Sequence, residues 1–158
     1  DKAGYTVDTT FWVIPPKKPW GHMVGLRVPF TAGDGTRIEL MDAHPVKVRV
    51  TLHRIEKDGS ETKVDLLHVV NMGTRSDENY KLVALPDDVA ISKGVRSYSV
   101  DERTQPPKVD GYIYELEFAS AGHVPLGQYH LRLQTLQDNP ALKDVPAFMV
   151  FDLSPYGK

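Results

Sequence analysis

Short runs that alternate apolar and polar residues, separated by Gly and Pro, constrain this chain more than any other feature. The chain has 158 residues, of which 12 are Gly and 12 are Pro. In the run VKVRVTLHRIE, at 46–56, Val48, Val50 and Leu52 alternate with polar residues. Successive side chains of a strand point to opposite faces, so such a run predicts a half-buried strand. The repetition of such runs at short intervals predicts an all-β fold.

The same pattern places the other strands. We predict them at 6–14, 23–30, 37–40, 61–70, 112–119, 128–136 and 147–153. Asp58-Gly59 predicts a two-residue type I′ hairpin turn, which would pair His53 with Val64. Residues 71–111 show no clear alternation, so we predict an irregular insertion there, in which residues 86–88 could begin a short helix.

One hydrophobic core is expected, because 158 residues suit a single domain spanning 1–158. The predicted core residues all lie on the apolar face of an alternating run: Val48, Val50, Leu52, Leu116, Phe118, Leu131 and Leu133. Glu115 and Glu117 take the opposite face of their run. They could mimic a catalytic carboxylate pair, but a solvated outer face is the simpler interpretation.

The segment VPLGQYHLRLQTL, at 124–136, carries the most specific pattern of the chain. Its Gly-x-Tyr resembles the tyrosine corner of immunoglobulin-like β-sandwiches, whose Tyr hydroxyl bonds to the backbone a few residues upstream. The resemblance covers 111–153 and implies that Tyr129 is buried and bonded within the 121–126 turn. Leu131 stands where antibody domains have a Cys, so it implies a disulfide-free relative. The predicted fold is an antiparallel immunoglobulin-like β-sandwich with the 71–111 insertion.

Motifs of catalysis and cofactor binding are missing from the sequence. There is no Cys, none of the six His residues forms a His-x-His or His-Glu-x-x-His motif, and no Gly-x-Ser-x-Gly or phosphate loop occurs. We interpret each His as exposed or satisfied by a hydrogen bond, and we assign no catalytic, cofactor-binding or metal-binding residue. The net charge of −2 lacks the basic excess of a nucleic-acid-binding protein. We therefore predict that the chain is not an enzyme, needs no cofactor and binds no nucleic acid.

A protein partner is the remaining expectation. Long irregular segments often carry recognition, and the run VDLLHVV before the insertion is apolar on both faces. The aromatic and Arg residues of the insertion are the candidate binding residues: Arg75, Tyr80, Arg96, Tyr98 and Arg103.

The whole chain is also similar to small sandwich domains of bacterial envelope lipoproteins, through PLGQYHLRL and the DG hairpin. Some of those domains are immunity partners of secreted effectors. The resemblance implies a periplasmic or envelope-anchored domain that binds a protein, including a toxic effector enzyme. The chain begins with Asp1 and not Met, so we expect either a mature form or a trimmed one, in which any targeting segment is no longer seen. Any membrane attachment would then come from a lipid anchor before Asp1. A carbohydrate-binding or other ligand-binding sandwich and an unrecognised hydrolase are the alternatives.

Overall fold

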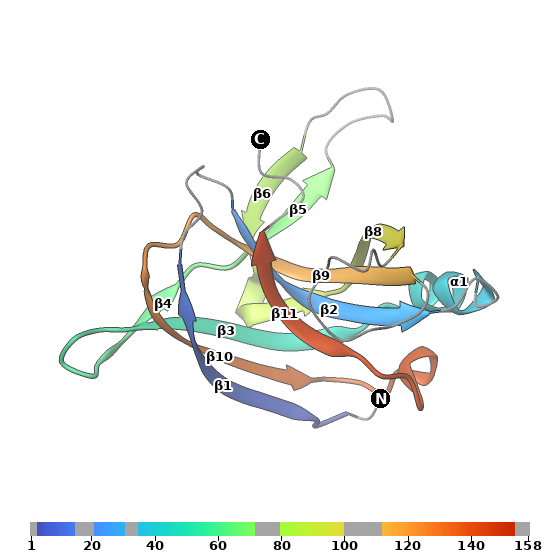
Figure 1. Ribbon diagram of the computed structural model, residues 1–158, viewed down its shortest axis with the longest axis horizontal. Coiled ribbons are helices and arrows are strands. Elements are labelled where there is room, and N and C mark those ends of the chain that lie inside the picture. The colour runs from blue at the N-terminus through green and yellow to red at the C-terminus, as the bar shows by residue number, and fades with distance from the viewer. Residues whose placement is uncertain (1–2, 15–20, 31–34, 72–79, 100–111, 154–158) are drawn as a thin grey trace.

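Two antiparallel sheets form the molecule (Figure 1). The computed structural model describes residues 3–14, 21–30, 35–71, 80–99 and 112–153. Sheet A contains β1 (Thr6–Val13), β10 (Gly127–Thr135), β3 (Lys47–Ile55), β4 (Glu61–Val64) and β7 (Val89–Ile91). Sheet B contains β11 (Phe148–Leu153), β2 (His22–Phe30), β9 (Tyr112–Gly122), β8 (Lys93–Ser99), β5 (Leu67–Asn71) and β6 (Tyr80–Ala84). The all-β prediction is confirmed.

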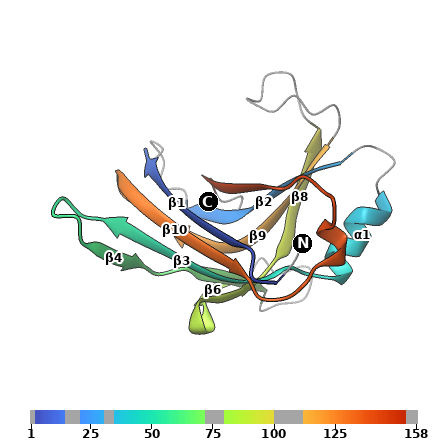
Figure 2. The same ribbon diagram turned by 90° about the horizontal axis from the view of Figure 1, so that it is seen from below.

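The core lies between the two sheets, which face each other in Figure 2. All seven predicted core residues are buried in one cluster, none more than 4% exposed. At one side of the sandwich, Phe11 of β1 packs against Phe151 of β11, with ring centroids 4.9 Å apart. The alternation of apolar residues therefore identified the correct face of β3, β9 and β10.

Tyr129 is completely buried in β10, and its hydroxyl donates a hydrogen bond of 2.8 Å to the carbonyl oxygen of Pro125. Burial also raises the pKa of the Tyr129 hydroxyl. The bond closes the turn between β9 and β10 from inside the core, so the predicted burial and the predicted bond within 121–126 are both found.

The hairpin between β3 and β4 differs from its prediction. Glu56 N–H donates to Ser60 O at 2.8 Å, so the loop has three residues, 57–59. Only Gly59 in that loop has a positive φ, of +84°, whereas a type I′ turn needs two such residues. The extra loop residue shifts the register by one, and His53 pairs with Lys63 while Leu52 pairs with Val64.

The predicted strand 61–70 is two strands in different sheets. β4 pairs with β3 in sheet A, and after residues 65 and 66 the chain continues as β5 in sheet B. Leu66 is buried at this crossing. A strand that changes sheets needs apolar residues on both sides, which explains the doubly apolar run VDLLHVV.

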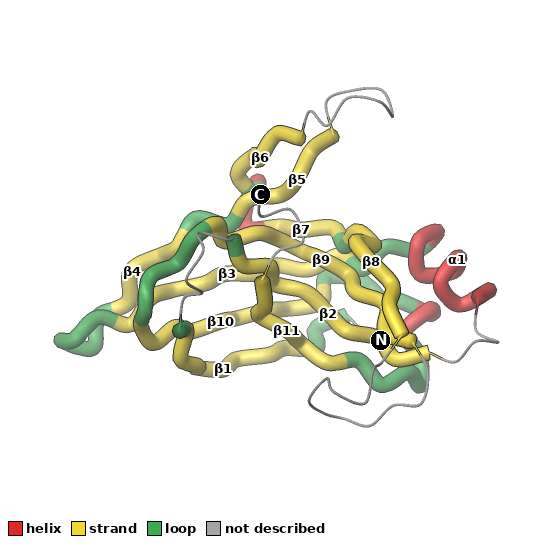
Figure 3. The backbone as a smooth tube through the Cα atoms, turned by 45° about the horizontal axis from the view of Figure 1, so that its top comes forward, coloured by secondary structure: helices red, strands yellow, loops and turns green. Residues whose placement is uncertain are grey.

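Residues 80–99 of the predicted irregular insertion are ordered into regular structure. β5 and β6 form a hairpin that projects from the sandwich in Figure 3, and η1 (Pro86–Asp88), β7 and β8 follow. Lys63 of β4 fixes η1 through a bidentate ion pair with Asp88, with N–O distances of 2.7 and 2.8 Å. The insertion is therefore irregular in sequence pattern but not in structure over these residues.

The prediction of a strand at 37–40 is wrong, because residues Gly35–Ala43 form the helix α1. Ile38 and Met41 stand three residues apart, a spacing that places both on one helix face, and both pack against the core. Asp42 accepts a 2.5 Å hydrogen bond from the Tyr114 hydroxyl of β9. A four-residue run fits either a strand or a helix, and these tertiary contacts favour the helix. A second short helix, η2 (Pro140–Leu142), precedes β11.

The Tyr129→Phe substitution should lower the free energy of unfolding by about 1 kcal/mol, because it removes one buried hydrogen bond and no packing volume. Urea unfolding of the two proteins measures the difference. Tyr5→Phe, at a residue 62% exposed, is the control and should have no effect. A neutral Tyr129→Phe would show that the corner bond does not stabilise the turn.

The Leu131→Ala substitution should lower the free energy of unfolding by roughly 2–5 kcal/mol, through lost burial and a cavity. Leu131 is only 1% exposed, whereas Leu126 is 58% exposed, so Leu126→Ala is a matched control with little expected effect. Equal losses in the two variants would place Leu131 outside the core.

Candidate functional site

A gap along one edge of β9 creates the candidate site. β8 pairs with the first half of this edge, from Tyr112 to Glu117, and β5 pairs with it at Ser120. Neither strand pairs with Phe118 or Ala119 on this edge. β7, which belongs to sheet A, leads directly into β8 of sheet B beside this gap. The site therefore lies where the chain passes from one sheet to the other.

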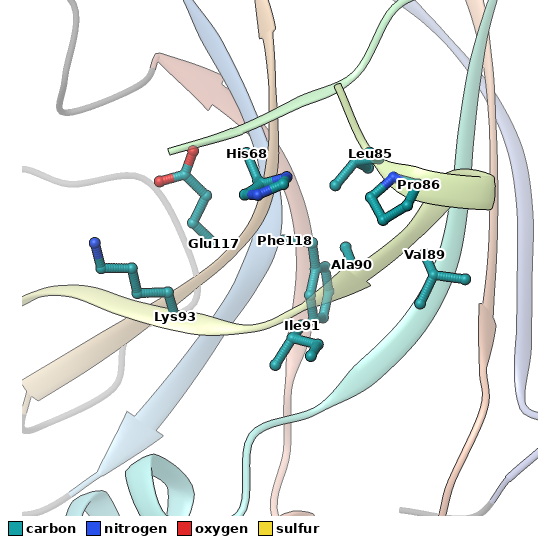
Figure 4. Close-up of a pocket in the computed structure, with 9 residues that line it drawn as sticks. All are labelled: His68, Leu85, Pro86, Val89, Ala90, Ile91, Lys93, Glu117 and Phe118. Carbon is teal, nitrogen blue, oxygen red and sulfur yellow. The ribbon is translucent and has the colours of Figure 1, made fainter. Parts of the chain in front are cut away.

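A pocket of about 280 Å³ opens at this gap (Figure 4). Phe118, Ala90 and Glu117 are the buried residues of its lining, while Pro86, Ile91 and Lys93 are exposed at its rim. His68 of β5, Leu85 and Val89 are half-buried between them. In Figure 4 the three polar side chains, Glu117, His68 and Lys93, lie on one side of the pocket and the apolar side chains on the other. The pocket is thus apolar on one wall and polar on the other.

Two buried polar atoms of this pocket have no hydrogen-bond partner among the described residues: Oε1 of Glu117 and Nδ1 of His68. Burial raises the pKa of Glu117 to about 7; Lys93 lowers it and Glu115 raises it further. A carboxyl with this pKa exchanges its proton near neutral pH. Unpartnered buried groups and shifted pKa values both concentrate at functional sites.

Glu115, two residues earlier on the same face of β9, has a different environment. It is fully buried and accepts a 2.8 Å hydrogen bond from Nε of Arg27 on β2. The second end of the Arg27 guanidinium binds Asp152 of β11. The predicted solvated outer face for Glu115 and Glu117 is therefore wrong, because β9 is the inner strand of sheet B and is buried on both faces.

His130 forms a second cluster, on the outer face of sheet A. Its ring nitrogens lie 2.5 Å from Oδ1 of Asp8 on β1 and 2.6 Å from Oε1 of Glu61 on β4. These hydrogen bonds raise the pKa of His130 and lower those of Asp8 and Glu61. Arg132 adds positive charge beside the two carboxylates. Both ring nitrogens of His130 are occupied, so this cluster links β1, β10 and β4.

The prediction that every His is exposed or satisfied is correct for His130 but wrong for His53 and His68. Both are half-buried, and their Nδ1 atoms lack a partner within the part of the chain that the structure describes. The register shift at the Lys57–Gly59 loop places His53 opposite Lys63 and not opposite Val64. The sheet crossing explains His68, because β5 carries it to the pocket.

The five predicted binding residues are only partly located. Arg75 and Arg103 lie outside the described residues. Tyr80 begins β6 and pairs with Asn71 of β5, while Arg96 and Tyr98 belong to β8 and pair with Glu115 and Ile113 of β9. The side chains of all five lie outside the described part of the structure. The pocket was missed because Glu117 was assigned to a solvated face. The signal that could have identified Glu117 is a carboxylate between apolar residues of an otherwise apolar strand.

No family model, no curated protein and no solved structure matches this chain. Across the described ranges, no group of three or more His, Asp or Glu residues is arranged to hold a metal ion. The helices that the structure describes include none with the length and apolar character to cross a membrane. The geometry of the pocket is therefore the main guide to function.

Glu117→Gln should change how stability depends on pH. The carboxyl loses its proton near pH 4.5 in the unfolded chain but near pH 7 in the native protein. The native state therefore binds more protons between these values, and the wild type should lose roughly 3 kcal/mol of stability as the pH rises from 4.5 through 7. The glutamine variant should lack this decrease. Urea unfolding at a series of pH values measures both curves.

The control for this experiment is Glu39→Gln, which removes an exposed carboxyl from α1 and should leave the pH dependence of the wild type unchanged. Parallel curves for the wild type and Glu117→Gln would contradict the raised pKa.

Proposed function

We propose that this chain is a non-enzymatic protein-binding domain of the bacterial cell envelope, and that the pocket beside β9 receives a side chain of its partner. The observation that carries the proposal is the buried, unpartnered Oε1 of Glu117 on one wall of a pocket whose other wall is apolar. Such a pocket fits an anchoring side chain that is buried at the centre of an interface.

The insertion supports this proposal, because it builds most of the pocket. Six lining residues come from 85–93: Leu85, Pro86, Val89, Ala90, Ile91 and Lys93. Ile91 is 59% exposed at the rim, and Leu82 of the projecting hairpin is 49% exposed. Exposed apolar side chains around a partly polar pocket are typical of an interface core. Arg75, Tyr80, Arg96, Tyr98 and Arg103 remain the proposed residues of the surrounding interface.

The envelope location and the class of partner rest on the resemblance to envelope lipoprotein domains. In this proposal the sandwich is immunoglobulin-like, which the hydrogen bond from Tyr129 to Pro125 supports. The partner is then a secreted effector enzyme, and the domain acts as its immunity protein by occupying a surface that the enzyme needs for activity.

The alternatives have weaker support. A pKa near 7 for Glu117 suits an acid–base catalyst of a hydrolase. However, the described residues that line the pocket include no hydroxyl or thiol nucleophile. A sugar-binding surface would use exposed aromatic rings on one sheet. Among the side chains that the structure describes, the exposed aromatic residues of the strands, Trp12, Tyr112 and Phe148, come from both sheets.

Two substitutions of equal exposure test the proposal. Ile91→Lys places a long cationic side chain at the rim of the pocket, and Leu126→Lys makes the same change in the turn before β10, at a residue 58% exposed. A partner is first captured from native extract with the wild-type domain and purified. Its affinity is then measured by calorimetry, and its enzymatic activity is assayed with and without the domain.

The expected result is a loss of affinity of at least about tenfold for Ile91→Lys and little change for Leu126→Lys. Inhibition of the partner's activity by the wild-type domain, and its loss in Ile91→Lys, would support the immunity role. Equal affinity of both variants would remove the pocket from the interface. Capture of no partner, together with retention on a polysaccharide column, would favour the carbohydrate-binding alternative.

A further inference from the structure

The polar wall of the pocket contains polar atoms that have no hydrogen-bond partner among the described residues. Glu117 is 6% exposed, and its Oε1 has no hydrogen-bond partner among the described residues. Nδ1 of His68, on the neighbouring strand β5, is also buried without a described partner. Leaving a buried acceptor unsatisfied is unfavourable. A bound group that donates hydrogen bonds to this wall would remove that cost.

The charges of the wall favour a cationic donor over a neutral or anionic one. Glu115 is paired with Arg27 at 2.8 Å, whereas Oε1 of Glu117 has no partner among the described residues, so Glu117 is the carboxyl whose charge depends most on what enters the pocket. Lys93 is near enough to favour its ionised form, yet burial and Glu115 dominate. A cation that enters the pocket would both donate to Oε1 and stabilise the ionised carboxylate. An anion would meet Glu117 and the buried Glu115 behind it.

The apolar wall indicates what kind of group is attached to the cation. Leu85, Val89, Ala90 and Phe118 lie opposite the polar side chains in Figure 4, and Pro86 and Ile91 border the opening. A bare inorganic cation would leave this wall in contact with water. An aliphatic stem would cover it while its charged end reached Glu117, as long cationic side chains do elsewhere. The volume of about 280 Å³ accommodates one such side chain.

We propose that the pocket selects an organic cation on an aliphatic stem, supplied as a lysine or arginine side chain of the protein partner, with Glu117 as its counter-ion. This inference rests on the protein-binding function proposed above. Glu117 accepts a hydrogen bond from the ammonium or guanidinium, His68 offers Nδ1 as a second acceptor, and the stem lies along the apolar wall.

The probes are n-butylammonium and n-butylguanidinium, which reproduce the ends of lysine and arginine, with 1-butanol and butyrate as neutral and anionic analogues. Binding to the full chain is followed by ¹H–¹⁵N NMR at the amides of Ala90, Ile91 and Phe118, and the carboxyl of Glu117 is followed by ¹³C NMR. We expect one or both cations to bind saturably in the millimolar range and to lower the pKa of Glu117 by about one unit or more.

The matched variants are Glu117→Gln, which keeps the shape of the side chain, and Glu39→Gln, which removes the same charge from the exposed side of α1. Cation binding should weaken by about tenfold in the first variant and not change in the second. Binding of 1-butanol as tight as that of the cations, preferred binding of butyrate, or binding of no probe would each overturn the proposal.

The two proposals fail in different ways. If Ile91→Lys loses the partner but neither cation binds, the protein-binding function stands and the cationic anchor is wrong. If the cations bind but Ile91→Lys keeps the partner, the pocket is a site for a free organic cation, and a partner side chain is not its occupant.

Discussion

The inner strand of sheet B, β9, is the constraint on which the rest of the structure depends. From Tyr114 to Ala121 every residue of this strand is buried, so both of its faces must be covered. β2 approaches so closely on one edge that a Cβ atom at Gly25 would lie 2.2 Å from the carbonyl oxygen of Leu116. On the other edge, β8 and β5 divide the strand between them. The pocket is the place where this second edge is incompletely paired.

The division of this edge of β9 between β8 and β5 follows from the order in which the strands of 61–99 join the two sheets. β4 and β7 both extend the same edge of β3 in sheet A, while β5 and β8 both join β9 in sheet B. The chain must therefore cross between the sheets beside the pocket, and each crossing is fixed by local bonds. Ser92 exchanges two bonds with Val46, both of 2.8 Å, and Leu85 N–H donates to Leu66 O at 3.1 Å. The insertion is thus part of the framework that holds the pocket open.

The sequence predicted the strands whose alternation reflects one buried and one exposed face. β1, β3 and β10 agree with their predicted limits to within a residue or so, and Tyr129 lies where the Gly-x-Tyr pattern placed it. The failures occur where tertiary contacts override local pattern. Residues 37–40 became helical through contacts of Met41 and Asp42. Residues 61–70 divided between the two sheets, and the doubly apolar run VDLLHVV reflects that crossing but does not locate the break between β4 and β5. The five binding candidates were chosen by residue type, whereas the pocket depends on which strands meet.

Glu115 and Glu117 provide an internal comparison between two buried carboxyl groups in different environments. They have the same side chain, lie two residues apart on one face of one strand, and are both nearly inaccessible to water. Glu115 is paired with Arg27, which is the usual way a fold stabilises a buried carboxylate. Oε1 of Glu117 has no such partner among the described residues, and the pKa of about 7 of this carboxyl reflects the cost of ionising it there.

A glutamine or a leucine at 117 would fill this space without that cost, and burying a carboxyl at this position lowers the stability of the protein at neutral pH. Local destabilisation of this kind is typical of binding sites. A ligand that enters such a site supplies the hydrogen bond or ion pair that the buried carboxylate lacks in the free protein.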